Sequence, residues 1–518
     1  MKLHRNARAA GLVRYQPCRA ALYPLLLVLI TILHSPTAAA EKSFKIAISA
    51  EPPSRGNPYA TTGTTPSFFW TSMYDALTNI DNEGNVQPWL AESWQATSAT
   101  TWQFKLRPNV VFSNGEPFNA GTVKAVVDFL KTDRGAGMSW ARDVRRLYAQ
   151  VRVIDELTVE LETVEPNAVL PAYAAWFYMA PARYLNEVGL DGLAQNPIGT
   201  GPFVVEDWRP GRVRMRKNPT SWLQPKVDTL EVLFVPDAAA RMQALQTGLV
   251  DVAMTLGPDD IPRLTAAGHR VAMRTPTRII GLALLTTDES SPFKDPRVRR
   301  AVNYAVNKKR LTTVLLGDLV EPASQPASKL AVGYNPDLAP YPYDPERAQR
   351  LLADAGYPDG FSFLAESPTG GLPNDTVILQ QIAADLAEVG VQMEVRLIPF
   401  AQLLKATIQG AWRGSALLMD FNNRHADALR PFTRTNHSCS GIAPWYCNMA
   451  IQRVIDQARR SADLDERTRL TRQIVRHYRD EASALWLFPV VGIDGLAKRV
   501  THWEPWNDHL MFHLVDVE

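Results

Sequence analysis

Apolar and polar residues alternate along several short runs of the chain, and this alternation predicts β-strands. Residues 44–49 (FKIAIS) and 227–236 (VDTLEVLFVP) each predict one strand. Residues 151–163 (VRVIDELTVELET) predict a β-hairpin, and residues 101–112 (TWQFKLRPNVVF) predict a strand, a turn and a second strand. Because a period of two places apolar side chains on one face, we expect these strands to form half-buried sheets.

Other segments space their apolar residues three and four apart, which predicts amphipathic helices. In residues 295–311, Asp295 can accept hydrogen bonds from the free amides of the first turn, and Pro296 stands where a missing N–H costs nothing. Further helices are expected at residues 120–132, 237–248, 344–356 and 451–481. An apolar run at residues 484–491 follows the last of them.

One stretch combines the alternating pattern of strands with the three- and four-residue spacing of a helix. A strand at residues 361–367, a helix at 375–390 and a strand at 391–398 form a strand-helix-strand sequence, which implies parallel pairing through a right-handed crossover. Because strands and helices alternate here and the chain shows no internal repeat, the pattern indicates an α/β fold.

The first 40 residues have the three-part pattern of a secretory signal. Five Lys and Arg residues come before the apolar run at residues 21–33, and small residues at Ala38 and Ala40 predict cleavage after Ala40. Thirteen residues are too few to cross a hydrocarbon core of about 30 Å. A membrane-anchored sensor is the alternative if the leader is retained. Cys18 precedes the apolar run, so no lipid-bearing cysteine is expected at the new N-terminus.

Charge and length narrow the class of protein. The formal charge of +2 becomes −3 without the five cations of the leader (50 Lys and Arg against 53 Asp and Glu), and no cluster of cations supports nucleic-acid binding. The 478 residues left after cleavage (518 less 40) exceed what one hydrophobic core usually organises, so two or more lobes are expected.

Three motifs are candidates for catalysis or for binding a phosphate or metal. Residues 196–205 (NPIGTGPFVV) lack both the third glycine of a dinucleotide loop and the lysine of a P-loop, so they predict a turn before a strand, with Gly199 and Gly201 in unusual backbone conformations. Ser291 and Lys294 match S-x-x-K without its companion motifs, which keeps a secreted hydrolase only as an alternative of another class. His509 and His513 are four residues apart and could share a helical face as ligands, although such a pair is more often a solvated feature of the tail. We expect no enzyme activity and no cofactor.

Cys439 and Cys447 are the two cysteines that remain after the leader. In an exported chain this spacing predicts a disulfide that closes a short loop. The alternative is a metal pair with His425 or His437, which lacks the spacing of a closed four-ligand site.

Four segments, in this order, resemble the family 5 solute-binding proteins of bacterial ABC importers: residues 91–120, 197–205, 240–254 and 296–311. The resemblance implies a periplasmic-binding-protein-like clamp of two α/β lobes joined by a hinge of two crossings. Lobe I would span residues 41–276, with an extra subdomain at about 82–195, and lobe II would span 277–488. Residues 489–518 would return to lobe I.

This resemblance also implies how such a protein works. The lobes close on a solute, the closed state docks on the permease in the membrane, and a separate subunit hydrolyses ATP. We therefore expect a periplasmic monomer that binds a short peptide or peptide-like solute and delivers it to ABC permease subunits. Uptake of nickel or another metal chelate is the alternative within the same class.

Residues 419–432 occupy the segment that supplies ligand contacts in this family. Asp427 is similar in placement to the aspartate that pairs with the α-amino group of a dipeptide; its structural alternative is a helix cap. The expected ligand contacts are Phe69, Trp70, Trp140, Arg142, Phe421, Asn422, Arg424, His425, Asp427 and Trp445.

Two departures separate this chain from the branches of the family. Asp427 replaces the histidine of nickel binders, although His425 is close by. Residues 368–375 lack the arginine that binds a dipeptide's carboxylate, for which Arg142 or Arg424 could substitute. Residues 438–447 resemble the disulfide-bearing loop of the peptide-binding branch, and this favours peptides.

Overall fold

The computed structural model describes residues 41–60, 68–136, 139–368, 375–410, 412–423, 425–434, 436–506 and 509–518. The chain divides after Ala40 into two units, and the second, Glu41–Glu518, is the one described below. The predicted leader lies outside the described residues. Within them, no helix combines the length and apolar character that crossing a membrane requires.

A seven-stranded mixed sheet organises the first lobe, which we call lobe I. Its strands, in spatial order, are β12 (Arg270–Arg274), β18 (Gly492–Leu496), β11 (Val252–Ala253), β1 (Ser43–Ile48), β10 (Thr229–Phe234), β9 (Arg212–Lys217) and β8 (Phe203–Arg209). β1 runs parallel to both β10 and β11, and β18 runs antiparallel to β11 and β12. The strands predicted at residues 44–49 and 227–236 are therefore neighbours at the centre of this sheet.

A five-stranded sheet organises the second lobe, lobe II. Its order is β15 (Val391–Ile398), β14 (Phe361–Pro368), β16 (Ala416–Asn422), β13 (Arg278–Leu284) and β17 (Ala484–Pro489). β14 and β15 pair in parallel along eight residues, with α11 (Asp375–Ala387) between them in sequence. The predicted strand-helix-strand unit is confirmed.

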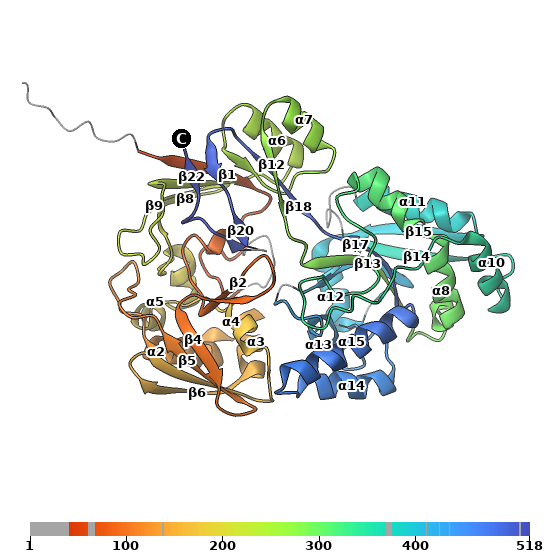
Figure 1. Cartoon of the computed structure of the whole chain (residues 1–518), viewed down its shortest axis with the longest axis horizontal. Coiled ribbons are helices and arrows are strands. Elements are labelled where there is room, and N and C mark those ends of the chain that lie inside the picture. The colour runs from red at the N-terminus through yellow and green to blue at the C-terminus, as the bar shows by residue number, and fades with distance from the viewer. Residues whose placement is uncertain are drawn as a thin grey trace, which may run out of the picture. The chain divides into compact units, whose positions relative to one another are not determined.

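The chain passes between the two sheets twice. It leaves the seven-stranded sheet at the end of β12 and enters the five-stranded sheet at β13, and it returns from β17 to β18. Figure 1 shows these two connections side by side between the lobes. Only residues 275–277 and 490–491 lie outside strands at the two crossings. The fold is therefore a two-lobed α/β clamp.

Lobe I carries a smaller four-stranded antiparallel sheet. Its order is β4 (Ala91–Ala96), β5 (Thr101–Leu106), β7 (Thr158–Thr163) and β6 (Tyr148–Asp155). The predicted hairpin is β6 and β7, but the second strand expected within residues 101–112 reduces to an isolated bridge between Val111 and Pro117. The lobe's other elements are β2 (Thr78–Ile80), β3 (Val86–Pro88), α2 (Ala120–Lys131), η1 (Asp133–Gly135), α3 (Ser139–Leu147), α4 (Leu170–Ala174), α5 (Ala182–Gln195), α6 (Ala238–Gln246), α7 (Asp260–Ala266), β19 (Val500–His502), β20 (Pro505–Trp506), β21 (His509–Leu510) and β22 (Asp516–Val517).

The remaining elements of lobe II are η2 (Pro292–Lys294), α8 (Pro296–Ala305), α9 (Lys308–Arg310), η3 (Leu311–Leu315), α10 (Pro345–Asp354), α12 (Phe400–Gln409), α13 (Arg430–Arg434), α14 (Met449–Arg459) and α15 (Leu464–Asp480). The single helix predicted at residues 451–481 is wrong, because it is two helices. Asp463 accepts a hydrogen bond from the amide of Glu466 at 2.7 Å and so caps a new N-terminus.

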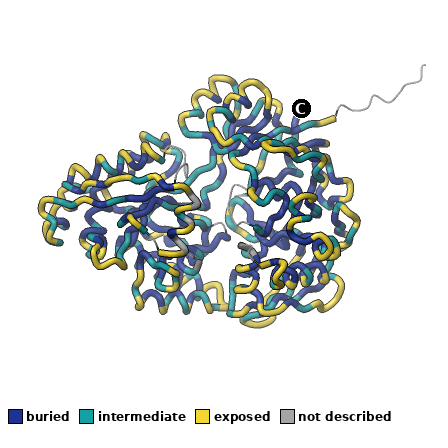
Figure 2. The backbone as a smooth tube through the Cα atoms, turned by 180° about the vertical axis from the view of Figure 1, so that it is seen from behind, coloured by how far each residue is buried: buried dark blue, intermediate teal, exposed yellow. Residues whose placement is uncertain are grey.

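Each lobe has its own hydrophobic core. Apart from Ala426 and Leu319 of lobe II, the cores around the seven- and four-stranded sheets draw on lobe I, while two further clusters on either side of the five-stranded sheet draw on lobe II. Figure 2 shows buried backbone running through both lobes beneath exposed helices and loops. Separate cores let the lobes hold their shapes independently, as a chain of this length requires.

The turn in NPIGTGPFVV precedes β8, as predicted, but its glycines act differently from the prediction. Neither Gly199 nor Gly201 is among the glycines with positive φ. A Cβ on Gly199 would lie 2.0 Å from the carbonyl oxygen of Met73, and one on Gly201 would lie 2.5 Å from the carbonyl carbon of Met73. These glycines permit close approach of two backbone segments rather than a left-handed turn.

Candidate functional site

A cavity of about 250 Å³ lies where side chains of both lobes meet. Lobe I contributes residues of α3, of β6 and of the segment from Val164 through α4, whereas lobe II contributes the turn after β16 and helices α13, α14 and α15. The lining residues are Asp143, Val144, Arg146, Leu147, Tyr148, Val164, Glu165, Pro166, Asn167, Tyr173, Phe177, His425, Thr433, Arg459 and Arg467. This volume lies just below the range of about 300–1,000 Å³ that is usual for small-molecule sites.

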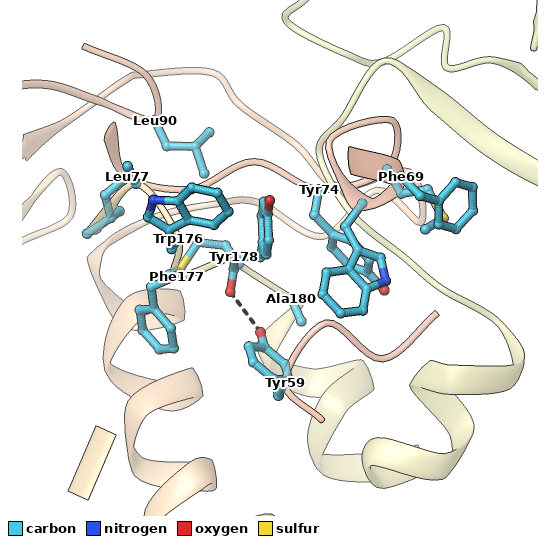
Figure 3. Close-up of a cluster of buried hydrophobic side chains, with 14 of the residues drawn as sticks. Tyr59, Phe69, Tyr74, Leu77, Leu90, Trp176, Phe177, Tyr178 and Ala180 are labelled. Carbon is cyan, nitrogen blue, oxygen red and sulfur yellow. Dashed lines mark hydrogen bonds between the residues drawn. The ribbon is translucent and has the colours of Figure 1, made fainter. Parts of the chain in front are cut away.

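The wall from lobe I is aromatic and firmly held. Tyr173 and Phe177 line the cavity, and Phe177 belongs to a buried aromatic cluster with its neighbours Trp176 and Tyr178 (Figure 3). The hydroxyl of Tyr59 donates a hydrogen bond of 2.9 Å to the carbonyl oxygen of Tyr178. Burial raises the pKa of the Tyr59 phenol, so this donor keeps its proton.

The wall from lobe II contains a buried ion pair. Arg467 of α15 donates through Nη2 to Oδ2 of Asp427 at 2.8 Å, and the side chains are 5% and 1% exposed. The backbone beside Asp427 is fixed by Val332, whose amide donates to Ala426 and whose carbonyl accepts from Ala428, at 2.8 and 3.0 Å. Asp427 Oδ1 accepts from the amide of Leu429 at 3.0 Å, just before α13. This bond closes a turn ahead of α13, which begins at Arg430, so the interpretation of Asp427 as a helix cap stays a prediction.

Several contacts cross the cavity from one lobe to the other. The ring of Tyr173 stacks on His425 with centroids 4.3 Å apart, and its hydroxyl donates to Asp427 at 3.3 Å. Glu165 of lobe I pairs with Arg459 at 3.1 Å and with Arg460 at 3.5 Å. Arg146 donates to the carbonyl oxygen of Thr433 at 3.0 Å. Because each contact joins a residue of lobe I to a residue of lobe II, these contacts link the two lobes at this site.

Two of the ten expected ligand contacts meet at this cavity: His425 lines it, and Asp427 bonds to its lining residues Tyr173 and Arg467. Six of the others, all of them described, do not line it. Phe69 and Trp70 are buried in lobe I, Phe421 and Trp445 are buried in lobe II, Asn422 ends β16 and Arg142 is exposed on α3. Arg424 lies outside the described residues, as does the side chain of Trp140. As ligand contacts, these eight remain predictions from the sequence.

The predicted disulfide between Cys439 and Cys447 is present. It closes the loop that holds Trp445, whose carbonyl oxygen accepts from the amide of Thr286 at 2.7 Å. His437, the alternative metal ligand, packs its ring against Phe421 at 4.3 Å, and burial lowers its pKa to about 3. Among the described residues, no group of three or more His, Cys, Asp or Glu side chains could hold a metal ion.

The residues of the S-x-x-K motif and of the histidine pair form ordinary contacts within the fold. Ser291 Oγ accepts from the amide of Phe293 at 3.3 Å, and Lys294 pairs with the exposed Glu289. His509 lies in strand β21 and His513 in the turn that follows, so the two do not share a helical face, which their spacing allowed as a possibility. His509 bonds Asn79 at 2.6 Å through its Nδ1.

Most of the residues that line the cavity were not predicted from the sequence. Tyr173, Glu165, Arg146, Arg459 and Arg467 were not among the expected contacts. One signal was available: Arg467 stands on the buried stripe of α15 with Leu470, Thr471 and Ile474. A cation on such a stripe has to find an anion, because an unpaired charge is costly to bury.

The fold and the cavity between its lobes are those of a periplasmic-binding-protein clamp. The chain belongs to the bacterial extracellular solute-binding proteins, family 5, whose sequence profile matches residues 85–441. The resemblance found in the sequence is thereby confirmed.

Individual relatives agree with this assignment. The chain is 27% identical over 516 residues to Di/tripeptide-binding protein 2 of Pseudomonas aeruginosa, covering 93% of this chain and 96% of that protein. The periplasmic binding protein DppA of Helicobacter pylori, solved with the peptide STSA, superposes with a TM-score of 0.77 at 22% identity, covering 92% of this chain and 99% of that one. NikA of Staphylococcus aureus, solved with Ni(L-His)2, gives 0.76 at 17% identity, covering 92% and 100%. These relatives are binding proteins rather than enzymes.

Proposed function

We propose that this protein binds a short peptide or peptide-like solute in the cavity between its lobes and delivers it to the permease of an ABC importer. The observation that carries the proposal is the composition of the cavity. Aromatic rings from lobe I face guanidinium and imidazole groups from lobe II, so closing the lobes surrounds a small polar solute with both kinds of contact. The di/tripeptide-binding relative supports peptides as the class of solute.

The proposed mechanism is hinge closure. Lobe I comprises residues 41–276 and 489–518, lobe II comprises residues 277–488, and the connections at 275–277 and 490–491 act as the hinge. A solute that contacts both lobes stabilises the closed state because it has more partners there than in an open one. No bond of the solute breaks, and ATP hydrolysis takes place on another subunit.

Export is part of the same proposal. The leader is removed after Ala40, and the mature protein works in the periplasm as a monomer. N-terminal sequencing of exported protein is expected to begin at Glu41. A sequence that begins at Met1 instead would favour the anchored alternative.

Thermal unfolding with candidate solutes tests the function. Exported protein without an affinity tag is unfolded and refolded to remove bound solute, and its melting is followed with di- to pentapeptides and, separately, with Ni²⁺ plus histidine. A solute at roughly 100 times its Kd stabilises the folded state by about 2.7 kcal/mol. Stabilisation by peptides is expected. Stabilisation by nickel-histidine alone would replace the peptide proposal with metal-chelate uptake.

A variant whose cavity is blocked by a larger side chain is the control for the thermal screen. Val164 lines the cavity with 56% of its surface exposed, so Val164→Trp occupies the mouth without disturbing the core. This variant should melt like the wild type alone and lose the response to peptides. Val153→Trp is the matched variant, since Val153 is 44% exposed in the same subdomain but is not a lining residue. An equal peptide response in both variants would contradict binding in this cavity.

A further inference from the structure

The Asp427 carboxylate has little capacity left for a ligand. Its Oδ1 accepts from the amide of Leu429, and its Oδ2 accepts from both Arg467 and Tyr173. A carboxylate offers about four acceptor positions, and three are taken. Its charge is also compensated, because the Arg467 guanidinium lies 2.8 Å away in a buried site. An ammonium group arriving here would meet a neutral ion pair rather than a free anion.

The other carboxylates of the cavity are occupied as well. Glu165 pairs with two guanidinium groups, those of Arg459 and Arg460. Asp143 has an interaction partner of its own. The lining therefore presents no carboxylate that is set aside for a positively charged ligand group.

The charges of the two arginines are paired as well, that of Arg467 with Asp427 and that of Arg459 with Glu165 and Asp456, but each arginine keeps an unused N–H donor. Arg459 and Arg467 both line the cavity, and the buried Nε–H of each has no acceptor among the described residues. The other nitrogens of Arg467 are used, with Nη1 donating to Ala458 at 2.9 Å and Nη2 to Asp427. Buried donors without acceptors are rare and costly in folded proteins. Among the described residues, Arg55 and Arg396 also have a buried Nε–H without an acceptor, but neither lines this cavity. At Arg459 and Arg467, a solute in the cavity could supply the acceptor.

We propose that Arg459 and Arg467 bind the carboxylate of the solute and that the solute needs no free α-amino group. The inference rests on the proposed function and specifies its ligand: peptide-like acids, including those with a blocked amino terminus. Asp427 is then a positioning residue that holds Arg467 in place. Its role as an ammonium anchor, expected from the resemblance, is replaced by this one.

Three chemical forms of one probe test the proposal. Pools of tripeptides randomised at every position are prepared with free ends, with an N-acetyl group and as C-terminal amides, and the apparent Kd of each pool is measured by titration. We expect acetylation to change the Kd by less than roughly threefold and amidation to weaken it at least roughly tenfold, since hydrogen bonds to charged groups are the stronger ones.

Two variants test whether the loss of affinity on amidation depends on the arginines of the cavity. Arg459→Gln should bring the ratio of acid to amide affinity close to one. It also removes an ion pair between the lobes, but that loss weakens acid and amide alike and leaves their ratio unchanged. Arg469→Gln is the matched control on α15, where Arg469 pairs with Glu466 on the exposed face. Arg467→Gln would leave Asp427 buried without its partner and would destabilise the fold, so the test uses a substitution of Arg459.

The outcomes separate this inference from the proposed function. Binding of the free pool with a loss of roughly a hundredfold on acetylation would keep the peptide function and overturn the inference, because it would show a dedicated ammonium site. An acid-to-amide ratio that Arg459→Gln leaves unchanged would also overturn it. Binding of no pool in any form would overturn the peptide function and the inference together.

Discussion

Glu165→Gln removes the charge that joins the lobes beside the cavity. Glu165 of lobe I lies 3.1 Å from Arg459 and 3.5 Å from Arg460, and the three side chains are 36%, 32% and 61% exposed. These ion pairs exist only when the lobes are in contact. The substitution therefore disfavours the closed state that holds the solute, without touching the core of either lobe.

The size of the effect follows from the exposure of these groups. Solvent-exposed ion pairs contribute about 0.2–1 kcal/mol each. Two of them give about 0.4–2 kcal/mol, which corresponds to a roughly two- to thirtyfold rise in the apparent Kd of the solute. The effect should depend on salt, because the screening length falls from about 30 Å at 10 mM to about 3 Å at 1 M.

Titration of a C-terminally amidated peptide, at about 10 mM and about 1 M salt, measures the change in Kd. The amide is used because Glu165→Gln also frees Arg459, the proposed partner of a solute carboxylate. The variant should bind more weakly than wild type at low salt and equally at high salt. Glu162→Gln is the matched control, since Glu162 pairs with Arg152 inside the β6–β7 hairpin. Equal affinity of Glu165→Gln and wild type at low salt, or a difference that persists at high salt, would refute an electrostatic link between the lobes.

Three further predictions concern stability. Asp427→Ala strands Arg467 in a buried site and should lower the free energy of unfolding by about 3–5 kcal/mol in denaturant titrations; an unchanged midpoint would contradict a buried pair. Cys439→Ser with Cys447→Ser opens a loop with a sequence separation of 8, which should cost about 2–3 kcal/mol by the same measurement, and reduction of the wild type should match it. Burial lowers the pKa of His437 from 6.5 to about 3, so between these values the unfolded state binds more protons and stability falls as the pH falls; His437→Phe should flatten that slope.

The starts of helices were predictable because the residues that cap them are local. Asp295 accepts from the amide of Arg297 at 2.8 Å, and Asp344 accepts from the amide of Arg347 at 2.9 Å, with proline at the first helical position in both cases. The end of α8 at Ala305 was not predicted, since the helical pattern continues to Leu311. There, the amide of Asn307 donates to the buried carboxylate of Asp385 at 2.8 Å, a partner 78 residues away.

The candidate site was harder to predict because its parts come together only in the folded chain. Tyr173 and Asp427 are 254 residues apart, and no spacing in the sequence links them. Phe69, Trp70 and Trp445 were expected at the ligand because aromatic residues suit such sites, but the same side chains also suit a core. All three are buried in the structure, and their contact with a ligand stays a prediction. Asp427 was expected from its position along the chain, whereas the ion-pair partner that it contacts, Arg467, comes 40 residues later.

The sequence by itself determined the class of fold, the parallel unit around α11, the helix caps, the disulfide and the family. Each of these depends on periodicity, on neighbours a few residues apart or on an ordered set of motifs. The tertiary structure decided which charges are compensated and which donors at the cavity lack an acceptor. Pairing of charges depends on distance in space, and residues from four separate segments become neighbours only when two lobes with independent cores meet.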